Sequence, residues 1–64
     1  TAPSVKMQEN DLTIKAYYYT AQWITTARKQ YKDKIIGLLE KTENIPNLHN
    51  PRRVILDLID YYKI

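Results

Sequence analysis

Glycine occurs only once in this 64-residue chain, at Gly37. Hairpin turns depend on glycine at positive φ, so a turn-rich β fold is poorly supported. Phosphate-binding loops of the glycine-rich kind are excluded for the same reason. The chain also lacks cysteine, which excludes a disulfide framework and a cysteine-based zinc site. We therefore predict one small all-α domain.

A helical pattern of apolar residues runs without a strong break over residues 12–43, and two interpretations are open. The first is a single helix over residues 11–43, about 45–50 Å long. The second is a helix over 11–30, a short break, and another helix over 33–43 that Asp33 would cap. Because a compact domain needs the break, we favour the second interpretation.

The start of the first helix is predicted at Asn10 or Asp11, since both side chains can accept hydrogen bonds from the free N–H groups of a first turn. The residues before this point carry few structural signals. We therefore divide the chain into a flexible arm or linker over 1–9 and a helical domain over 10–64.

The third helix has the clearest start signal in the chain. Asn50 is a good capping residue and Pro51 suits the first helical position, so a helix over 51–63 is predicted after a loop over 44–50. The fold class expected is thus a small three-helix domain with an extended N-terminal arm.

The first helix is apolar on two opposite sides, at 100° per residue. We assign one side to the intrachain core, together with apolar residues of the other two helices. The predicted core is Ile14, Tyr17, Ala21, Ile24, Ile35, Leu38, Leu39, Val54, Ile55, Leu58 and Ile59. The two shorter helices cannot wrap the first one fully, so its other side needs a separate partner.

That other side is the candidate protein interface, and it consists of Leu12, Ala16, Tyr19, Trp23 and Ala27. Tyrosine and tryptophan are enriched among the residues that dominate interface energies. The sequence therefore favours a protein-interaction or self-association module, part of a larger assembly or regulator, whose partner is another protein or a second copy. On this interpretation Trp23→Ala weakens association more than it weakens the fold.

A mild basic bias supports an alternative function. The net charge is +3 and the isoelectric point is about 9.3. Two groups of basic residues could contact phosphates in a small nucleic-acid-binding domain; they are Arg28, Lys29, Lys32 and Lys34, and then Arg52 and Arg53. Arg28 and Lys29 would also suit the C-terminal end of a first helix that stops near residue 30. Arg52 and Arg53 would lie in a first turn, where the helix dipole disfavours cations, and a pair of Arg53 with Asp57 would offset part of that cost.

No catalytic constellation is expected. The chain has one serine, Ser4, and one histidine, His49, and nothing in the pattern brings them together with a third group. We predict no enzymatic activity, no cofactor and no metal ligand. The longest stretch without a charge, residues 16–27, is shorter than the roughly 18 apolar residues that a membrane span needs, and association with a membrane surface ranks below the two functions above.

Overall fold

Three helices make up most of residues 4–45 and 47–64, which are the residues that this computed structural model describes. Helix α1 covers Val5–Thr26, α2 covers Lys29–Asn44 and α3 covers His49–Tyr62. No strand occurs within the described ranges. The predicted all-α class, with three helices, is confirmed.

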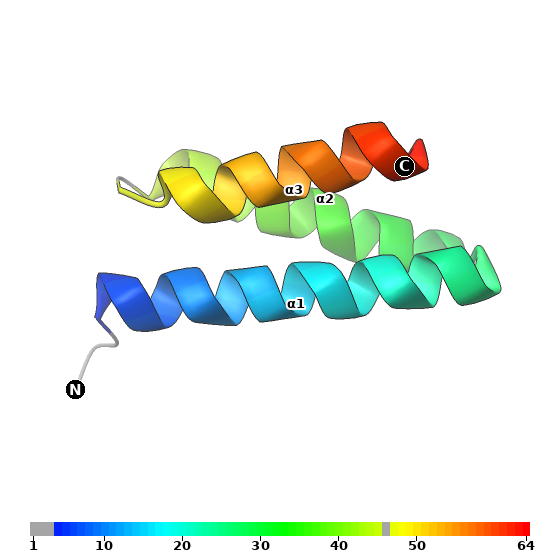
Figure 1. The fold of residues 1–64 in the computed structure, drawn as a ribbon, viewed down its shortest axis with the longest axis horizontal. Coiled ribbons are helices and arrows are strands. Elements are labelled where there is room, and N and C mark those ends of the chain that lie inside the picture. The colour runs from blue at the N-terminus through cyan, green and yellow to red at the C-terminus, as the bar shows by residue number, and fades with distance from the viewer. Residues whose placement is uncertain (1–3, 46) are drawn as a thin grey trace.

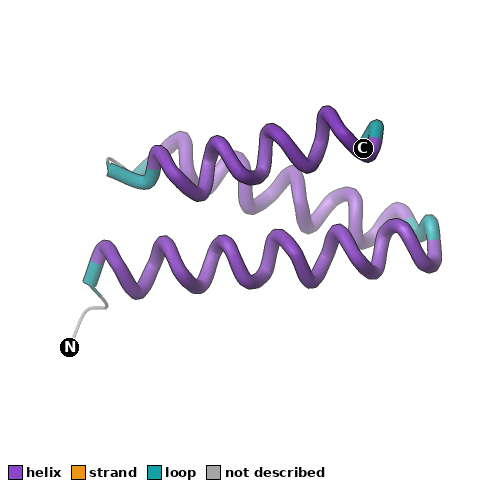
Figure 2. The backbone as a smooth tube through the Cα atoms, viewed as in Figure 1, coloured by secondary structure: helices purple, strands orange, loops and turns teal. Residues whose placement is uncertain are grey.

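The helices form a short antiparallel bundle of 36 × 21 × 15 Å. Helices α1 and α3 run in the same direction and α2 runs against them, as Figure 1 shows. Each helix packs against the other two. The α1–α2 turn and the C-terminus therefore lie at one end of the bundle, and the start of α1 and the α2–α3 loop lie at the other. Figure 2 shows how short the connections are.

Helix α1 begins six residues earlier than the pattern indicated. Ser4 is its N-cap, and the Ser4 side-chain oxygen accepts a hydrogen bond of 3.2 Å from the backbone N–H of Met7. The cap satisfies one of the first N–H groups, so the helix needs no start at Asn10. The predicted arm over 1–9 is thus wrong for residues 5–9, which are helical; residues 1–3 lie outside the described part of the chain.

The break between the first two helices exists, but it lies at Ala27 and Arg28 rather than near Asp33. Ala27 takes the left-handed conformation, with φ at 53°, and its N–H donates to the Trp23 carbonyl. Two threonines precede it, and the hydroxyls of Thr25 and Thr26 donate to backbone carbonyls four residues earlier. β-Branched side chains of this kind lower helix propensity, which favours an end at this point.

Helix α3 also begins earlier than predicted, at His49, with Leu48 as an N-cap that makes no side-chain hydrogen bond. Pro51 is then the third helical residue rather than the first. It is tolerated there because the first-turn N–H groups have no carbonyl partner within the helix. Leu48 and Pro51 are both buried, so the start of this helix closes one end of the core.

The core differs from the prediction mainly in α1. Ile35, Leu38 and Ile55 are buried as predicted, and Leu39, Leu58 and Ile59 pack against them half-buried. Val54 is also half-buried. The four α1 residues of the predicted core are exposed instead: Ile14, Tyr17, Ala21 and Ile24. From α1 the core receives the opposite side of the helix.

Candidate protein-interaction surface

The side of α1 that the sequence assigned to a partner faces the intrachain core. We call this side the inner face of α1; it consists of Leu12, Ala16, Tyr19 and Trp23. Leu12 is 2% exposed and Ala16 is 0% exposed. The candidate interface was therefore wrong for these two residues, because α2 and α3 already cover them.

The remaining three residues of that candidate interface divide between core and surface. Tyr19 and Trp23 are half-buried and pack against the core cluster. Ala27 is exposed, but it serves as the left-handed C-cap of α1. Trp23 thus supports the fold. The expectation that Trp23→Ala acts mainly on association assumed that Trp23 faces away from the core, and it packs against the core instead.

The opposite side of α1 carries an apolar surface that is left exposed by the described residues of the chain. We call it the outer face of α1, and it consists of Ile14, Tyr17, Tyr18, Ala21 and Ile24. Ile14 is 67% exposed, and the two tyrosines and Ile24 are each more than half exposed. Large apolar side chains scattered singly on a surface are ordinary, but these side chains form a contiguous set on one helix face.

Helix α3 extends the outer face through its last turn. Tyr61 and Tyr62 are both exposed, and their rings meet edge to face with centroids 4.7 Å apart. A groove of about 360 Å³ lies between these tyrosines and α1. Its lining consists of Tyr17, Val54, Asp57, Leu58, Tyr61 and Tyr62. The exposed aromatic surface is therefore shared by two helices that are far apart in the sequence.

Between Tyr17 and Ile24 the outer face is uncharged, because residues 16–27 contain no acidic or basic side chain. A charged pair flanks Ile14, where Lys15 Nζ is 2.9 Å from an Asp11 carboxylate oxygen. The hydrogen bond and the negative charge of Asp11 raise the pKa of Lys15. This pair is solvated and satisfied within α1, so the outer face itself offers only apolar contact and tyrosine hydroxyls.

The two basic groups of the alternative function lie at opposite ends of the bundle. Arg28, Lys29, Lys32 and Lys34 are at the α1–α2 end, whereas Arg52 and Arg53 are at the end where α3 begins (Figure 1). The 16-residue helix α2 separates the two ends by roughly 24 Å. The structure does not bring the six residues into one basic patch.

Several of these basic side chains also have neighbours within the chain. Lys34 Nζ lies 5.5 Å from the centroid of the Tyr19 ring, which is cation–π distance. The Arg52 guanidinium lies 3.8 Å from a Glu43 carboxylate oxygen, with both side chains about half exposed. Arg28, Lys29 and Arg53 are exposed, and Lys32 is half-buried.

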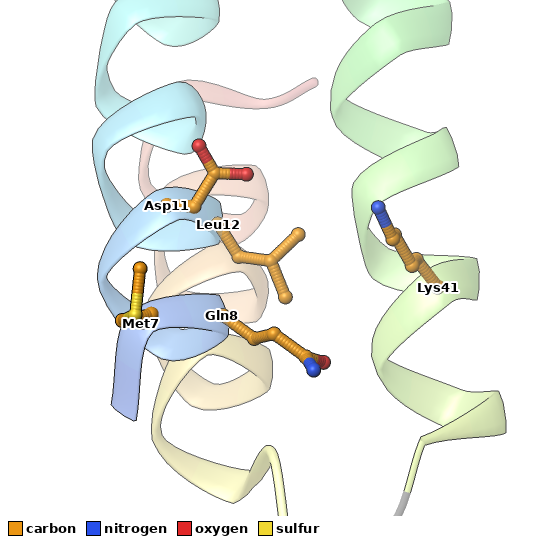
Figure 3. A pocket seen from close by; sticks show the side chains of 5 residues that line it. All are labelled: Met7, Gln8, Asp11, Leu12 and Lys41. Atoms are coloured by element: carbon orange, nitrogen blue, oxygen red, sulfur yellow. The ribbon is translucent and has the colours of Figure 1, made fainter. Parts of the chain in front are cut away.

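A second groove, of about 410 Å³, lies between the start of α1 and the end of α2. It is lined by Met7, Gln8, Asp11, Leu12 and Lys41. Figure 3 shows Gln8 and Leu12 pointing from α1 toward α2, and Lys41 reaching toward them. One carboxylate and one ammonium group at its rim do not form a catalytic arrangement, so this groove adds no chemistry of its own.

Ser4 and His49, considered above for catalysis, both lie at helix starts. The Ser4 hydroxyl caps α1, and His49 is the exposed first residue of α3. In residues 4–45 and 47–64 no three His, Asp or Glu side chains gather as metal ligands would. None of the described helices combines the length and the apolarity needed to cross a bilayer.

Comparisons of the chain with protein-family models, with curated proteins and with solved structures find no match. The fold and the surface of the chain are therefore the only indications of its class. That surface belongs to a small three-helix bundle whose longest helix is apolar on both sides.

Proposed function

We propose that this domain is a non-enzymatic protein-interaction or self-association module that works through the outer face of α1. The single observation that carries the proposal is the exposure of an uncharged apolar and aromatic surface along the middle of α1. Leaving such a surface wet costs free energy in proportion to its area, and covering it with a partner recovers that free energy.

The kind of residue on the surface supports the same function. Tyrosines supply a large contact area with little loss of side-chain entropy, and their hydroxyls tolerate water when the partner is absent. Two tyrosines of the outer face, Tyr17 and Tyr18, and the neighbouring Tyr61 of α3 are more than half exposed. These side chains therefore supply strong anchors for a partner.

The experiment compares a face variant with a control of equal charge. The face variant is Ile14→Lys with Ile24→Lys; the control is Gln30→Lys with Asn50→Lys, at two exposed polar positions away from the outer face. We measure self-association by sedimentation equilibrium, and partner binding by quantitative affinity capture from the source cells. The proposal expects the parent and the control to share associations that the face variant loses.

The same pair of variants can contradict the proposal. If the parent, the control and the face variant are all monomeric and retain the same proteins, the outer face has no role in association. Circular dichroism of each variant must show parental helicity, because a loss of helix would remove binding for another reason.

Nucleic-acid binding is the weaker alternative, since the two basic groups lie at opposite ends of the bundle and form no single patch. Each phosphate contact adds about one unit to the slope of log K against log salt. Binding at low salt with a slope above about four, reduced by Arg52→Ala with Arg53→Ala as well as by Lys29→Ala with Lys32→Ala, would favour the alternative. Absence of binding at low salt would eliminate it.

A further inference from the structure

The outer face of α1 has an internal symmetry that points to its partner. Ile14 and Ile24 lie five positions on either side of residue 19, and Tyr17 and Ala21 lie two positions on either side of it. The steps along this set are three, four and three, which is the spacing of a two-helix seam. The face is therefore complementary to itself when one copy is turned end for end.

We infer that the partner of the outer face is a second copy of this chain, with the two α1 helices packed antiparallel about a two-fold axis at residue 19. This inference rests on the function proposed above and specifies its partner. Ile14 of each copy then lies level with Ile24 of the other, and the large Tyr17 lies level with the small Ala21. Pairing large with small side chains lets two helix surfaces interdigitate.

Charge supports the antiparallel direction. Glu9 and Asp11 lie before the outer face, and Arg28 and Lys29 follow it. A parallel pair would bring the two copies of Arg28 and Lys29 to the same end, where like charges repel. The antiparallel pair instead places the two copies of these cations at opposite ends of the seam, and it also opposes the two helix dipoles.

The available area is sufficient for a specific dimer. The four tyrosines of the surface, Tyr17, Tyr18, Tyr61 and Tyr62, are between 39% and 77% exposed. Side chains of this size at such exposure offer on the order of 100 Å² each. Together with Ile14 and Ile24 the surface reaches roughly 600 Å², the lower limit per partner for a specific interface.

The two-fold axis also explains the tyrosines of α3. A two-fold axis perpendicular to α1 makes the contact isologous, which means that both copies use the same surface. It keeps the α3 helices of both copies at the same edge of the α1–α1 seam. Tyr61 and Tyr62 then extend the contact on that edge rather than remaining isolated at the surface.

The decisive test uses single cysteines, which the parent chain lacks. Ile14→Cys and Ile24→Cys are made separately, because both positions are exposed and tolerate the change. In the inferred dimer, two copies of residue 14 are about 15 Å apart along the helix axis, too far for a disulfide. Residues 14 and 24 of different copies lie level with each other.

We expect neither variant alone to form a disulfide-linked dimer under mild oxidation, and a 1:1 mixture to form the linked heterodimer. Cross-linking of either variant with itself, or no cross-linking of the mixture, overturns the antiparallel inference. Sedimentation equilibrium of the parent gives the second criterion: a monomer throughout the range from about 1 µM to about 500 µM overturns the second-copy inference.

A charge pair provides an independent measurement in solution. Ile14→Lys alone and Ile24→Glu alone should each raise the dissociation constant at least tenfold, because each buries an unpaired charge. Mixing the two variants should restore most of the affinity, since Lys and Glu then meet across the seam. Failure of the mixture to recover counts against the register.

These measurements distinguish the inference of a second copy from the broader proposal of a protein-interaction module. If the parent is strictly monomeric and the Ile14→Lys, Ile24→Lys variant loses a bound protein, the inference of a second copy is overturned and the proposed function stands. A monomeric parent whose face variant loses nothing overturns both.

Discussion

Leu12 and Ile14 lie only two positions apart on α1, yet Leu12 is 2% exposed and Ile14 is 67% exposed. Two positions correspond to about 200° around a helix, so these side chains point to opposite sides. Both are large and aliphatic, and nothing in their chemistry distinguishes the inside from the outside. This difference in burial decides how a substitution at each position changes the stability of the domain.

The first prediction compares these two residues directly. Leu12→Ala removes a fully buried side chain and should lower the free energy of unfolding by about 2–5 kcal/mol, which approaches the total stability of a domain this small. Ile14→Ala should change it by less than about 1 kcal/mol in dilute solution. Urea denaturation followed by circular dichroism measures both, and equal losses would mean that the outer face is also part of the core.

Trp23→Ala should weaken the fold, in contrast to the expectation from the sequence. Trp23 is half-buried and packs against the core cluster, so its truncation should cost about 2–4 kcal/mol of stability. The matched change one residue later, Ile24→Ala, should cost little because that side chain is 54% exposed. Thermal unfolding of both variants, monitored at 222 nm or by heat capacity, tests this order; a Trp23→Ala variant as stable as the parent contradicts it.

Thr20→Val should stabilise the domain by about 0.5–2 kcal/mol. The Thr20 hydroxyl is buried without a hydrogen-bond partner, and replacing it with a methyl group of the same shape removes the cost of its desolvation. The control is Thr42→Val, because the buried Thr42 hydroxyl donates to the Leu39 carbonyl at 2.6 Å. That change should destabilise by about 1 kcal/mol, and the two midpoints in urea should move in opposite directions.

Gly37→Ala should raise stability by about 0.5–1 kcal/mol, since glycine inside a helix is entropically unfavourable. A Cβ atom added at Gly37 would meet nothing within 4 Å, so no clash opposes the gain. The melting temperature of the variant at low concentration is the measurement. A decrease would contradict this prediction.

Ala27→Gly should also stabilise the domain, by up to about 1 kcal/mol. Ala27 has φ at 53° in the C-cap of α1, a conformation that glycine adopts without the steric cost imposed by Cβ. Substituting alanine for glycine in mid-helix and glycine for alanine at the cap should therefore both help. A loss of stability in Ala27→Gly would indicate that the gain in unfolded-chain entropy exceeds the relief at the cap.

The sequence alone determined that the chain is helical, where the third helix lies to within two residues, and that the first helix is apolar on two sides. These features are local: they depend on propensity, on proline and capping residues, and on the 3.6-residue period. The start of α1 was harder to predict from the sequence, because Ser4 and Asn10 offer the same capping chemistry. No local signal shows which of the two residues caps the helix.

Only the tertiary structure decided which side of α1 is the inside. The stripe containing Leu12 and the stripe containing Ile14 have the same period and similar composition, so each could form a core by itself. Two short helices can cover only one side of a third helix, and the choice depends on how well Ala16, Thr20 and Trp23 fit between α2 and α3. That fit joins residues distant in the sequence, and no pattern within α1 contains it.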